Sequence, residues 1–355
     1  MRDVLDRPAA VRPGEELDLK RLAEYLRRIF PDLAGPIELE QFPSGYSNLT
    51  YLVRVAGSEM VVRRPPVGSR VQTAHDMGRE YRILSQLHPV FELAPRPLAF
   101  CDDAGVLGAP FYLMERVRGL ILRREPPPGL ELTPETVRAL GEAFVRQLVR
   151  LHTLDYEAAG LGDLGKPEGY VERQVNGWRR RYFGSQTDDI PEIEEIADWL
   201  VERLPGESGA SLIHNDYKYD NLVLDPVNPT RIRALLDWEM ATIGDPLMDL
   251  GSSLAYWVEA SDPEPLLRFR FVPTHLPGSL TRREVAALYA RLSGASIENL
   301  AYYYCFGLFR LAVIAQQIYY RYRKGLTRDE RFAPMIDAIR VLGRTALRVA
   351  ETEEV

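Results

Sequence analysis

The chain has 355 residues, 46% of them hydrophobic and 27% charged, with a formal net charge of -7. This length exceeds what one compact core usually holds, so two folded lobes are expected. The negative balance argues against a nucleic-acid partner and against a polybasic membrane-binding surface. Cys101 and Cys305 are too few and too far apart for a secreted disulfide scaffold, and no long apolar run or leader is apparent. A cytoplasmic protein is therefore expected.

The first third of the sequence predicts an antiparallel sheet with two helices. Apolar residues recur at helical spacing before Pro31, and alternating runs separated by Gly, Ser and Asn predict strands joined by turns. The expected helices are 16–30 and 75–87, and the expected strands are 37–40, 50–55, 60–63, 95–100 and 111–114.

Beyond Gly119, a residue suited to a hinge, the pattern becomes mainly helical. A breaker at 126–129 precedes a helix start at Thr133, and 261–277 is rich in proline without a clear period, which predicts a surface loop near the site. The expected helices are 133–151, 191–203, 282–292, 297–322 and 328–349, with short strands at 222–224 and 232–236. We therefore expect an α+β fold with lobes 1–117 and 118–355 and a hinge near 115–119.

One stretch carries the chemistry. Asp216 is followed five residues later by Asn221, and an apolar run then leads to Asp237. A carboxylate can accept a hydroxyl proton, while an amide oxygen and a second carboxylate are the hard donors that Mg²⁺ prefers. This spacing predicts phosphoryl transfer, with Asp216 as catalytic base and with Asn221 and Asp237 as metal ligands.

These motifs resemble the aminoglycoside phosphotransferase family of small-molecule kinases, whose fold is two-lobed and protein-kinase-like. His214-Asn215-Asp216 stands where the family usually has His-Gly-Asp, Leu236-Asp237-Trp238-Glu239 matches its metal-binding segment, and a Gly-Asp-Pro element follows from Gly244. The resemblance implies Mg²⁺ and ATP as cofactors, with GTP left open, and a small hydroxylated acceptor.

The residues around the motif have more than one interpretation. The resemblance and the lack of a second His or Cys at ligand spacing make His214 a support of the loop rather than a ligand. Asp245 before Pro246 predicts a helix cap. Asp249 either anchors the catalytic loop or faces the substrate. Arg179-Arg180-Arg181, beside Trp178, could bind an anionic substrate tail, although a solvated helix face is the commoner explanation.

In the first lobe the resemblance implies nucleotide contacts. Ser47 and Asn48 fall in a turn that would cover the triphosphate. Arg63 stands where many kinases have Lys, and Glu80 is its matching helix partner. Arg retains the charge but presents a planar fork. Arg64 is expected to be solvated. Backbone groups of Glu115 and Val117 would hydrogen-bond a purine edge.

The acceptor cannot be named from the sequence. Arg63-Arg64-Pro65-Pro66 resembles a branch whose kinase domains occur fused to or near acyl-CoA dehydrogenases, which implies a hydroxyacyl metabolite. The alternatives are an aminoglycoside kinase, for which a denser acidic C-terminal surface is expected, and a pseudokinase that binds nucleotide without turnover, suggested by Arg63. Nucleic acid and membrane are not expected partners, and the oligomeric state is open.

Overall fold

The computed structural model describes residues 6–33, 35–42, 48–66 and 76–355, and the chain divides into two compact units. The first unit comprises Met1–Ile121, Leu222–Asn228 and Ile232–Glu239, and the second comprises Leu122–Asn221, Pro229–Arg231 and Met240–Val355. The sequence-based lobes ended at residue 117 and assigned the two later segments to the second lobe. The first unit instead includes them, together with Asp237.

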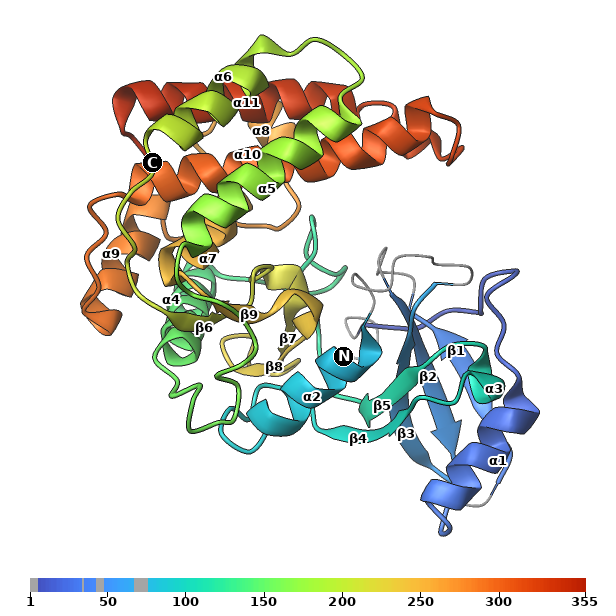
Figure 1. Ribbon diagram of the computed structural model, residues 1–355. Helices are drawn as coiled ribbons and strands as arrows, with labels where there is room; N and C mark the ends of the chain where they lie inside the picture. Colours follow the sequence, from blue (N-terminus) through green and yellow to red (C-terminus); the bar gives the residue numbers. More distant parts are fainter. Residues whose placement is uncertain (1–5, 34, 43–47, 67–75) are drawn as a thin grey trace. The chain divides into compact units, whose positions relative to one another are not determined.

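The first unit is built on an antiparallel sheet. Within its described residues five strands are hydrogen-bonded in the order β1-β2-β3-β5-β4 (Figure 1). The strands are β1 (Glu38–Gln41), β2 (Leu49–Val55), β3 (Ser58–Arg64), β4 (Pro97–Cys101) and β5 (Phe111–Glu115), and the helices are α1 (Leu19–Ile29), α2 (Met77–Leu87) and α3 (Ala104–Leu107). The five strands, α1 and α2 confirm the predicted elements to within a few residues at each end, whereas α3 was not predicted.

The two faces of this sheet have different tasks. Val62 of β3 and Leu113 of β5 belong to a buried apolar cluster with Leu22 and Leu26 of α1. Successive side chains in a strand point to opposite faces, so Arg63 must project away from that cluster. On the face of the sheet to which Arg63 points, Glu80 of α2 supplies the carboxylate that pairs with the guanidinium. The alternation of the strand therefore aims a cation at α2.

The later segments of the first unit form a small hairpin of β7 (Leu222–Leu224) and β8 (Ile232–Leu235). Leu120 and Leu224 exchange backbone hydrogen bonds of 3.0 and 2.8 Å, and Leu235 donates to the Leu93 carbonyl at 2.8 Å. Gly119 lies so close that a Cβ there would be 2.3 Å from the Leu224 oxygen. Glycine is required at 119 by this close approach.

The second unit is mainly helical. Its longest helix, α10 (Leu300–Arg323), packs against α5, α6, α7 and α11 (Figure 1). The other elements are α4 (Pro134–His152), α5 (Tyr170–Ser185), α6 (Pro191–Glu202), α7 (Pro246–Ala255), α8 (Glu264–Arg268), α9 (Arg282–Ser293), α11 (Met335–Thr352), β6 (Ser211–Ile213), β9 (Thr242–Gly244) and the short 3-10 turns η2 (Tyr219–Asn221), η3 (Trp238–Met240) and η4 (Glu330–Phe332).

Three sequence-based expectations need correction. The segment 261–277 contains α8, because Pro263 and Glu264 begin a short helical turn there. The last helix begins at Met335 rather than at 328, since Pro334 stands at its start. Helix α5 was not predicted as a helix from its apolar pattern, which its glycines and arginines interrupt. Among the described helices, none is both long and apolar enough to cross a membrane.

Helices α7 and α10 touch through glycines. A Cβ on Gly251 would lie 2.2 Å from the Tyr303 carbonyl oxygen, and one on Gly307 would lie 2.3 Å from the Gly251 oxygen. We expect Gly251→Ala to lower the free energy of unfolding by about 3 kcal/mol, because backbone rather than a flexible side chain must move. Denaturant unfolding of the variant and the wild type measures this difference in free energy.

Gly177→Ala in α5 is the matched control. Nothing lies within 4 Å of the Cβ that this change would add. Helix propensity alone then acts, so the control variant is expected to gain up to about 1 kcal/mol. Equal stability of the Gly251 variant and the wild type would contradict the close helix contact.

Candidate functional site

The predicted catalytic loop follows β6 in the second unit and makes a sharp turn at Asn215. Asn215 has a positive φ of 65°, which costs a non-glycine residue energy unless its surroundings hold it. Its Nδ2 donates to the Met240 carbonyl at 3.1 Å and lies 3.2 Å from the Tyr170 hydroxyl. Asn215 thus adopts the conformation that glycine favours and is fixed there by its side chain.

The carboxylate of Asp249 stabilises the same turn. Its two carboxylate oxygens accept the backbone N–H groups of His214, at 2.7 Å, and of Asn215, at 2.8 Å. Nε2 of His152 from α4 lies 3.2 Å from Oδ2 of Asp249, and Nδ1 of the same ring is 2.8 Å from the Tyr289 hydroxyl oxygen. Burial alone would raise the pKa of Asp249, but the hydrogen bond and charge of His152 and contacts with His214 lower it below its ordinary value. Of the two predicted roles, this geometry matches the loop anchor.

Asp216 lies at the centre of a small polar cluster. Its backbone N–H donates to Nδ1 of His214 at 3.2 Å, and both its carboxylate oxygens accept from Nζ of Lys218, at 2.9 and 2.8 Å. Burial alone would lower the pKa of Lys218, but Tyr256, Asp216 and Asp220 raise it above its ordinary value. Lys218 is therefore a cation held beside the predicted base.

Asn221 has its amide oriented by the same cluster. Its Nδ2 donates to the backbone oxygen of Asp216 at 2.8 Å and to the Asp216 carboxylate at 2.9 Å. Both hydrogen bonds use the nitrogen, and none of the described residues donates to the Oδ1 atom. A neutral oxygen with its lone pairs available is a donor that Mg²⁺ accepts. The two predicted residues of this loop are thus brought together.

Aromatic residues border the cluster. Nζ of Lys218 lies 4.8 Å from the centroid of the Tyr256 ring, and Tyr256 contacts Phe271 with ring centroids 5.7 Å apart. Phe271 belongs to the segment expected to lie near the site, and it is exposed. Burial raises the pKa of the Tyr256 phenol, so this group stays neutral at physiological pH.

In the first unit the predicted residues meet at Arg63. Its Nε lies 3.2 Å from Glu80, and its Nη2 lies 2.5 Å from Asp237 and 3.3 Å from Glu239. Arg63 and Glu80 are buried. Asn48 donates to Glu239 at 2.5 Å, and Arg79 donates to the Glu239 carbonyl at 3.0 Å. Three carboxylates thus surround one guanidinium.

The pKa values of both members of the buried pair are raised, which favours the charged form of Arg63 but the neutral form of Glu80. Burial lowers the pKa of Arg63, but Glu80 and Asp237 raise it well above its ordinary value; burial also raises the pKa of Glu80, against the effect of Arg63. We adopt the ionised pair, because Arg does not deprotonate in proteins and an unpaired buried cation is costly.

Asp237 is held in an unusual backbone conformation. Its φ is 69°, in the left-handed region that few non-glycine residues occupy. Such conformations cluster at functional sites, where the surroundings compensate the strain. Here the carboxylate of Asp237 is directed to Arg63 and remains partly exposed. It is therefore accessible to a metal ion as well as to the guanidinium.

The remaining nucleotide predictions have mixed outcomes. Ser47 lies outside the described residues. The backbone N–H of Glu115 donates to the carbonyl of Arg96 at 2.9 Å, so this N–H is not available to a purine. Val117 packs beside Ile121 in a small apolar cluster. The expectation that Arg64 is solvated was wrong: the side chain is buried and donates to the Pro65 oxygen at 3.2 Å.

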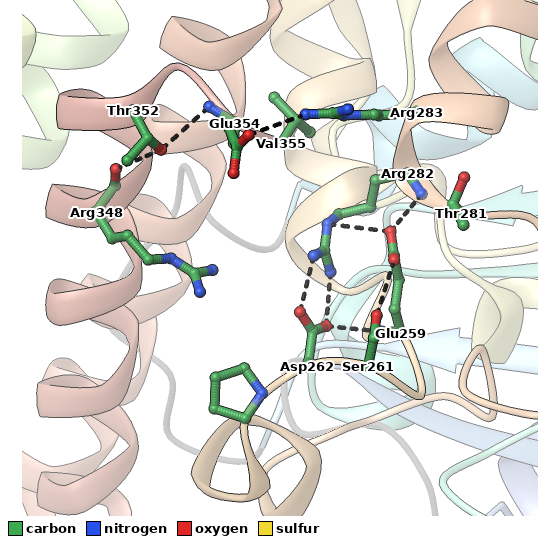
Figure 2. A pocket seen from close by; sticks show the side chains of 11 residues that line it. Glu259, Ser261, Asp262, Thr281, Arg282, Arg283, Arg348, Thr352, Glu354 and Val355 are labelled. Atoms are coloured by element: carbon green, nitrogen blue, oxygen red, sulfur yellow. Dashed lines mark hydrogen bonds and ion pairs between the residues drawn. The ribbon is translucent and has the colours of Figure 1, made fainter.

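The described part of the second unit contains a pocket of about 320 Å³ at a different set of residues. Figure 2 shows Arg282 bonded to Asp262 and Glu259 on one side, with Arg348 from α11 on the other. Arg282 also donates to the Trp257 carbonyl at 3.0 Å, and the Trp257 ring packs on Tyr219. This ion-pair network therefore holds the segment that follows α7 against η2.

Three residues of interest were missed from the sequence. Lys218 and Glu239 stand within two residues of predicted site carboxylates, and their charge was the available signal. Arg310 interrupts the apolar run Phe306 to Ala315 in the middle of α10, which is an unusual place for a charge. None has the motif spacing that singled out Asp216.

Comparison with known proteins places the chain in a family. A family model described as "Phosphotransferase enzyme family" matches residues 38–288. Acyl-CoA dehydrogenase family member 10 of Mus musculus is 37% identical over 84% of this chain and 28% of its own length, and member 11 of Homo sapiens is 31% identical over 97% and 44%. The chain thus spans less than half the length of these relatives.

Solved structures agree. A candidate aminoglycoside phosphotransferase from Ralstonia eutropha is 31% identical, with a TM-score of 0.80 over 95% of this chain and 99% of that one. Choline kinase of Cryptosporidium parvum shares the fold at 14% identity, with a TM-score of 0.58 over 91% and 99%. These matches confirm the protein-kinase-like fold. The chain belongs to the aminoglycoside phosphotransferase family of phosphotransferase enzymes.

Proposed function

We propose that the chain transfers the γ-phosphate of ATP or GTP, with Mg²⁺, to a hydroxyl group of a small metabolite. The observation that carries the proposal is the pairing of Asp216 with Asn221. The amide nitrogen of Asn221 fixes the Asp216 carboxylate while its oxygen stays available for a metal. One residue thereby orients the base and offers a magnesium ligand, as phosphoryl transfer needs.

In this mechanism Asp216 accepts or orients the proton of the acceptor hydroxyl. Lys218 donates to both carboxylate oxygens, which fixes the direction of the group. The loop itself is held by Asp249 through the N–H groups of His214 and Asn215. Catalysis is then mainly positioning and charge neutralisation.

The metal would be held by the Oδ1 atom of Asn221 and the carboxylate of Asp237. Bound Mg²⁺ supplies positive charge that neutralises the triphosphate. The partly exposed carboxylate of Asp237 suits such an ion. Arg63, paired with Glu80, takes the role of a phosphate-binding cation, with Asn48, Ser47 and backbone groups of Glu115 and Val117 as further nucleotide contacts.

Structural relatives support a nucleotide-dependent reaction. A solved aminoglycoside phosphotransferase APH(4)-Ia in a ternary complex with AMP-PNP and hygromycin B shares the fold, with a TM-score of 0.57 at 16% identity. Similarity to acyl-CoA dehydrogenase family members over most of this chain favours a hydroxyacyl acceptor. An aminoglycoside acceptor is the second candidate, supported by the Ralstonia eutropha relative.

The test is nucleotide turnover with Mg²⁺ against hydroxyacyl compounds, other hydroxylated metabolites and aminoglycosides. Asp237→Asn is expected to weaken Mg²⁺-dependent nucleotide binding at least about 10-fold, because a charged oxygen ligand is lost. Binding measured in EDTA should change far less. Asp102→Asn, an exposed carboxylate of the same unit, is the control.

The outcomes separate the candidates. Turnover of aminoglycosides alone would support the antibiotic kinase. Absence of turnover with every acceptor, together with nucleotide binding unchanged in Asp237→Asn, would leave only a pseudokinase. Equal Mg²⁺-dependent affinity of the Asp237 variant and the wild type would remove this residue from the metal site.

A further inference from the structure

Arg310 is a buried cation that no carboxylate of the described residues neutralises. It lies in the apolar middle of α10 and is only 5% exposed. Its contacts with the described residues are a 3.6 Å interaction of Nη2 with the sulfur of Met240 and stacking on Trp178, with Cζ 5.3 Å from the ring centroid. A thioether and an aromatic face compensate a buried charge only weakly.

Two of the other buried arginines, Arg282 and Arg63, show the partners that Arg310 lacks, whereas Arg64 has only the Pro65 carbonyl. Arg282 is 6% exposed and forms two hydrogen bonds to Asp262, at 2.7 and 2.8 Å, with Glu259 beside it. Arg63 is 7% exposed and has three carboxylates around it. Arginine is rarely buried without such a partner. The environment of Arg310 therefore lacks an anion.

A second guanidinium shares the aromatic ring. Cζ of Arg181 from α5 lies 4.5 Å from the centroid of Trp178, and Arg181 has no ion pair among the described residues. Arg181 is exposed overall, but partial burial of its guanidinium, and then the charges of Arg310 and Arg180, lower its pKa. The guanidinium groups of Arg181 and Arg310 stack on the same tryptophan ring, and their like charges repel each other. An anion between them would relieve that repulsion and satisfy their donors.

This pair of cations adjoins the catalytic loop. Met240, which contacts Arg310 through its sulfur, accepts the side-chain hydrogen bond of Asn215 through its carbonyl. The charges of both Asp216 and Arg310 act on the phenol of Tyr256. Met240, which links Arg310 to Asn215 of the catalytic loop, is 39% exposed and offers apolar surface there. All these residues belong to the second unit.

We propose that Arg310 and Arg181 bind an anionic group of the acceptor, a carboxylate or a phosphate, while Asp216 receives its hydroxyl. The assignment to the acceptor rests on the proposed function. Met240 and the Trp178 ring contact the body of the molecule between its anionic and hydroxyl ends. A polycationic aminoglycoside is disfavoured by the same two charges.

The experiment compares three probes of one chain length: hydroxyhexanoate, its neutral methyl ester and hydroxyhexyl phosphate. Binding of each is measured by calorimetry without nucleotide, and turnover is measured with ATP and Mg²⁺. The variants are Arg310→Met, Arg310→Lys and Arg181→Met. Arg180→Met, an exposed neighbour on the same helix, is the control. Thermal unfolding checks that each variant is folded.

We expect Arg310→Met to weaken binding of the preferred anionic probe about 10- to 100-fold and to raise its KM similarly, as for loss of a charge-assisted hydrogen bond. The ester should change less than about twofold, since it makes no such bond. Arg310→Lys should recover part of the affinity. Whether the carboxylate or the phosphate is preferred identifies the anion.

Several results would overturn the proposal. These are equal binding of the ester and both anions to the wild type, equal loss for all probes in Arg310→Met, or a rise in the KM for ATP with acceptor preference unchanged. If Arg310→Met does not fold, the same comparison in Arg310→Lys and Arg181→Met decides. Anion binding that depends on Arg310 without turnover of any probe would retain the anion site and refute phosphoryl transfer to these acceptors.

Discussion

Asp216→Asn should reduce turnover about 10²- to 10⁴-fold, the range that a general base contributes. The amide keeps the shape of the side chain, and it can still contact Asn221, but it cannot accept a proton. Because the nucleotide contacts proposed here lie on other residues, nucleotide affinity should change less than about twofold. Steady-state turnover and nucleotide titration of the same preparation measure the two quantities.

Loss of charge at Asp216 also leaves Lys218 without its nearest carboxylate. A small loss of stability is expected, since Asp220 remains 3.8 Å away. Asp189→Asn, an exposed carboxylate of the second unit, controls for the change of net charge. Wild-type turnover in Asp216→Asn would refute the assignment of the base, whereas loss of nucleotide affinity in parallel with turnover would indicate a collapsed loop.

Arg63→Met should destabilise the protein by about 3–5 kcal/mol, the typical cost of removing one partner from a buried ion pair. Met fills a comparable volume, so the effect is mainly electrostatic. Glu80 would remain buried without its cation, and Asp237 and Glu239 would repel each other more strongly. The free energy of unfolding in denaturant measures the loss.

Arg63→Lys separates stability from function. An ammonium retains the charge but not the planar fork that contacts Glu80 through Nε and the two other carboxylates through Nη2. Partial recovery of stability is expected, with a nucleotide affinity different from that of the wild type. A stability loss below about 1 kcal/mol in Arg63→Met would contradict the ion-pair description, because that is the scale of exposed pairs.

Much of the fold was open to prediction because the relevant interactions are local. Strand alternation and turn residues located β1 to β5, and Thr133 before a proline located the start of α4. Asp245 caps α7 through Leu247, as its place before Pro246 predicted. Where a pattern was interrupted, as in α5, prediction failed because burial against other helices, rather than periodicity, determines that helix.

The sequence by itself predicted the reaction class, because Asp216, Asn221 and Asp237 have the spacing expected of a metal-dependent phosphotransferase. The sequence could not decide which cations would form ion pairs with those carboxylates. Only the tertiary structure brings Arg63 from β3 to Asp237, nearly half the chain away, and only it leaves Arg310, in the middle of α10, without an anion from any described residue. The reason is physical: a motif is set by neighbours in sequence, whereas the balance of buried charge depends on which distant side chains lose their water together.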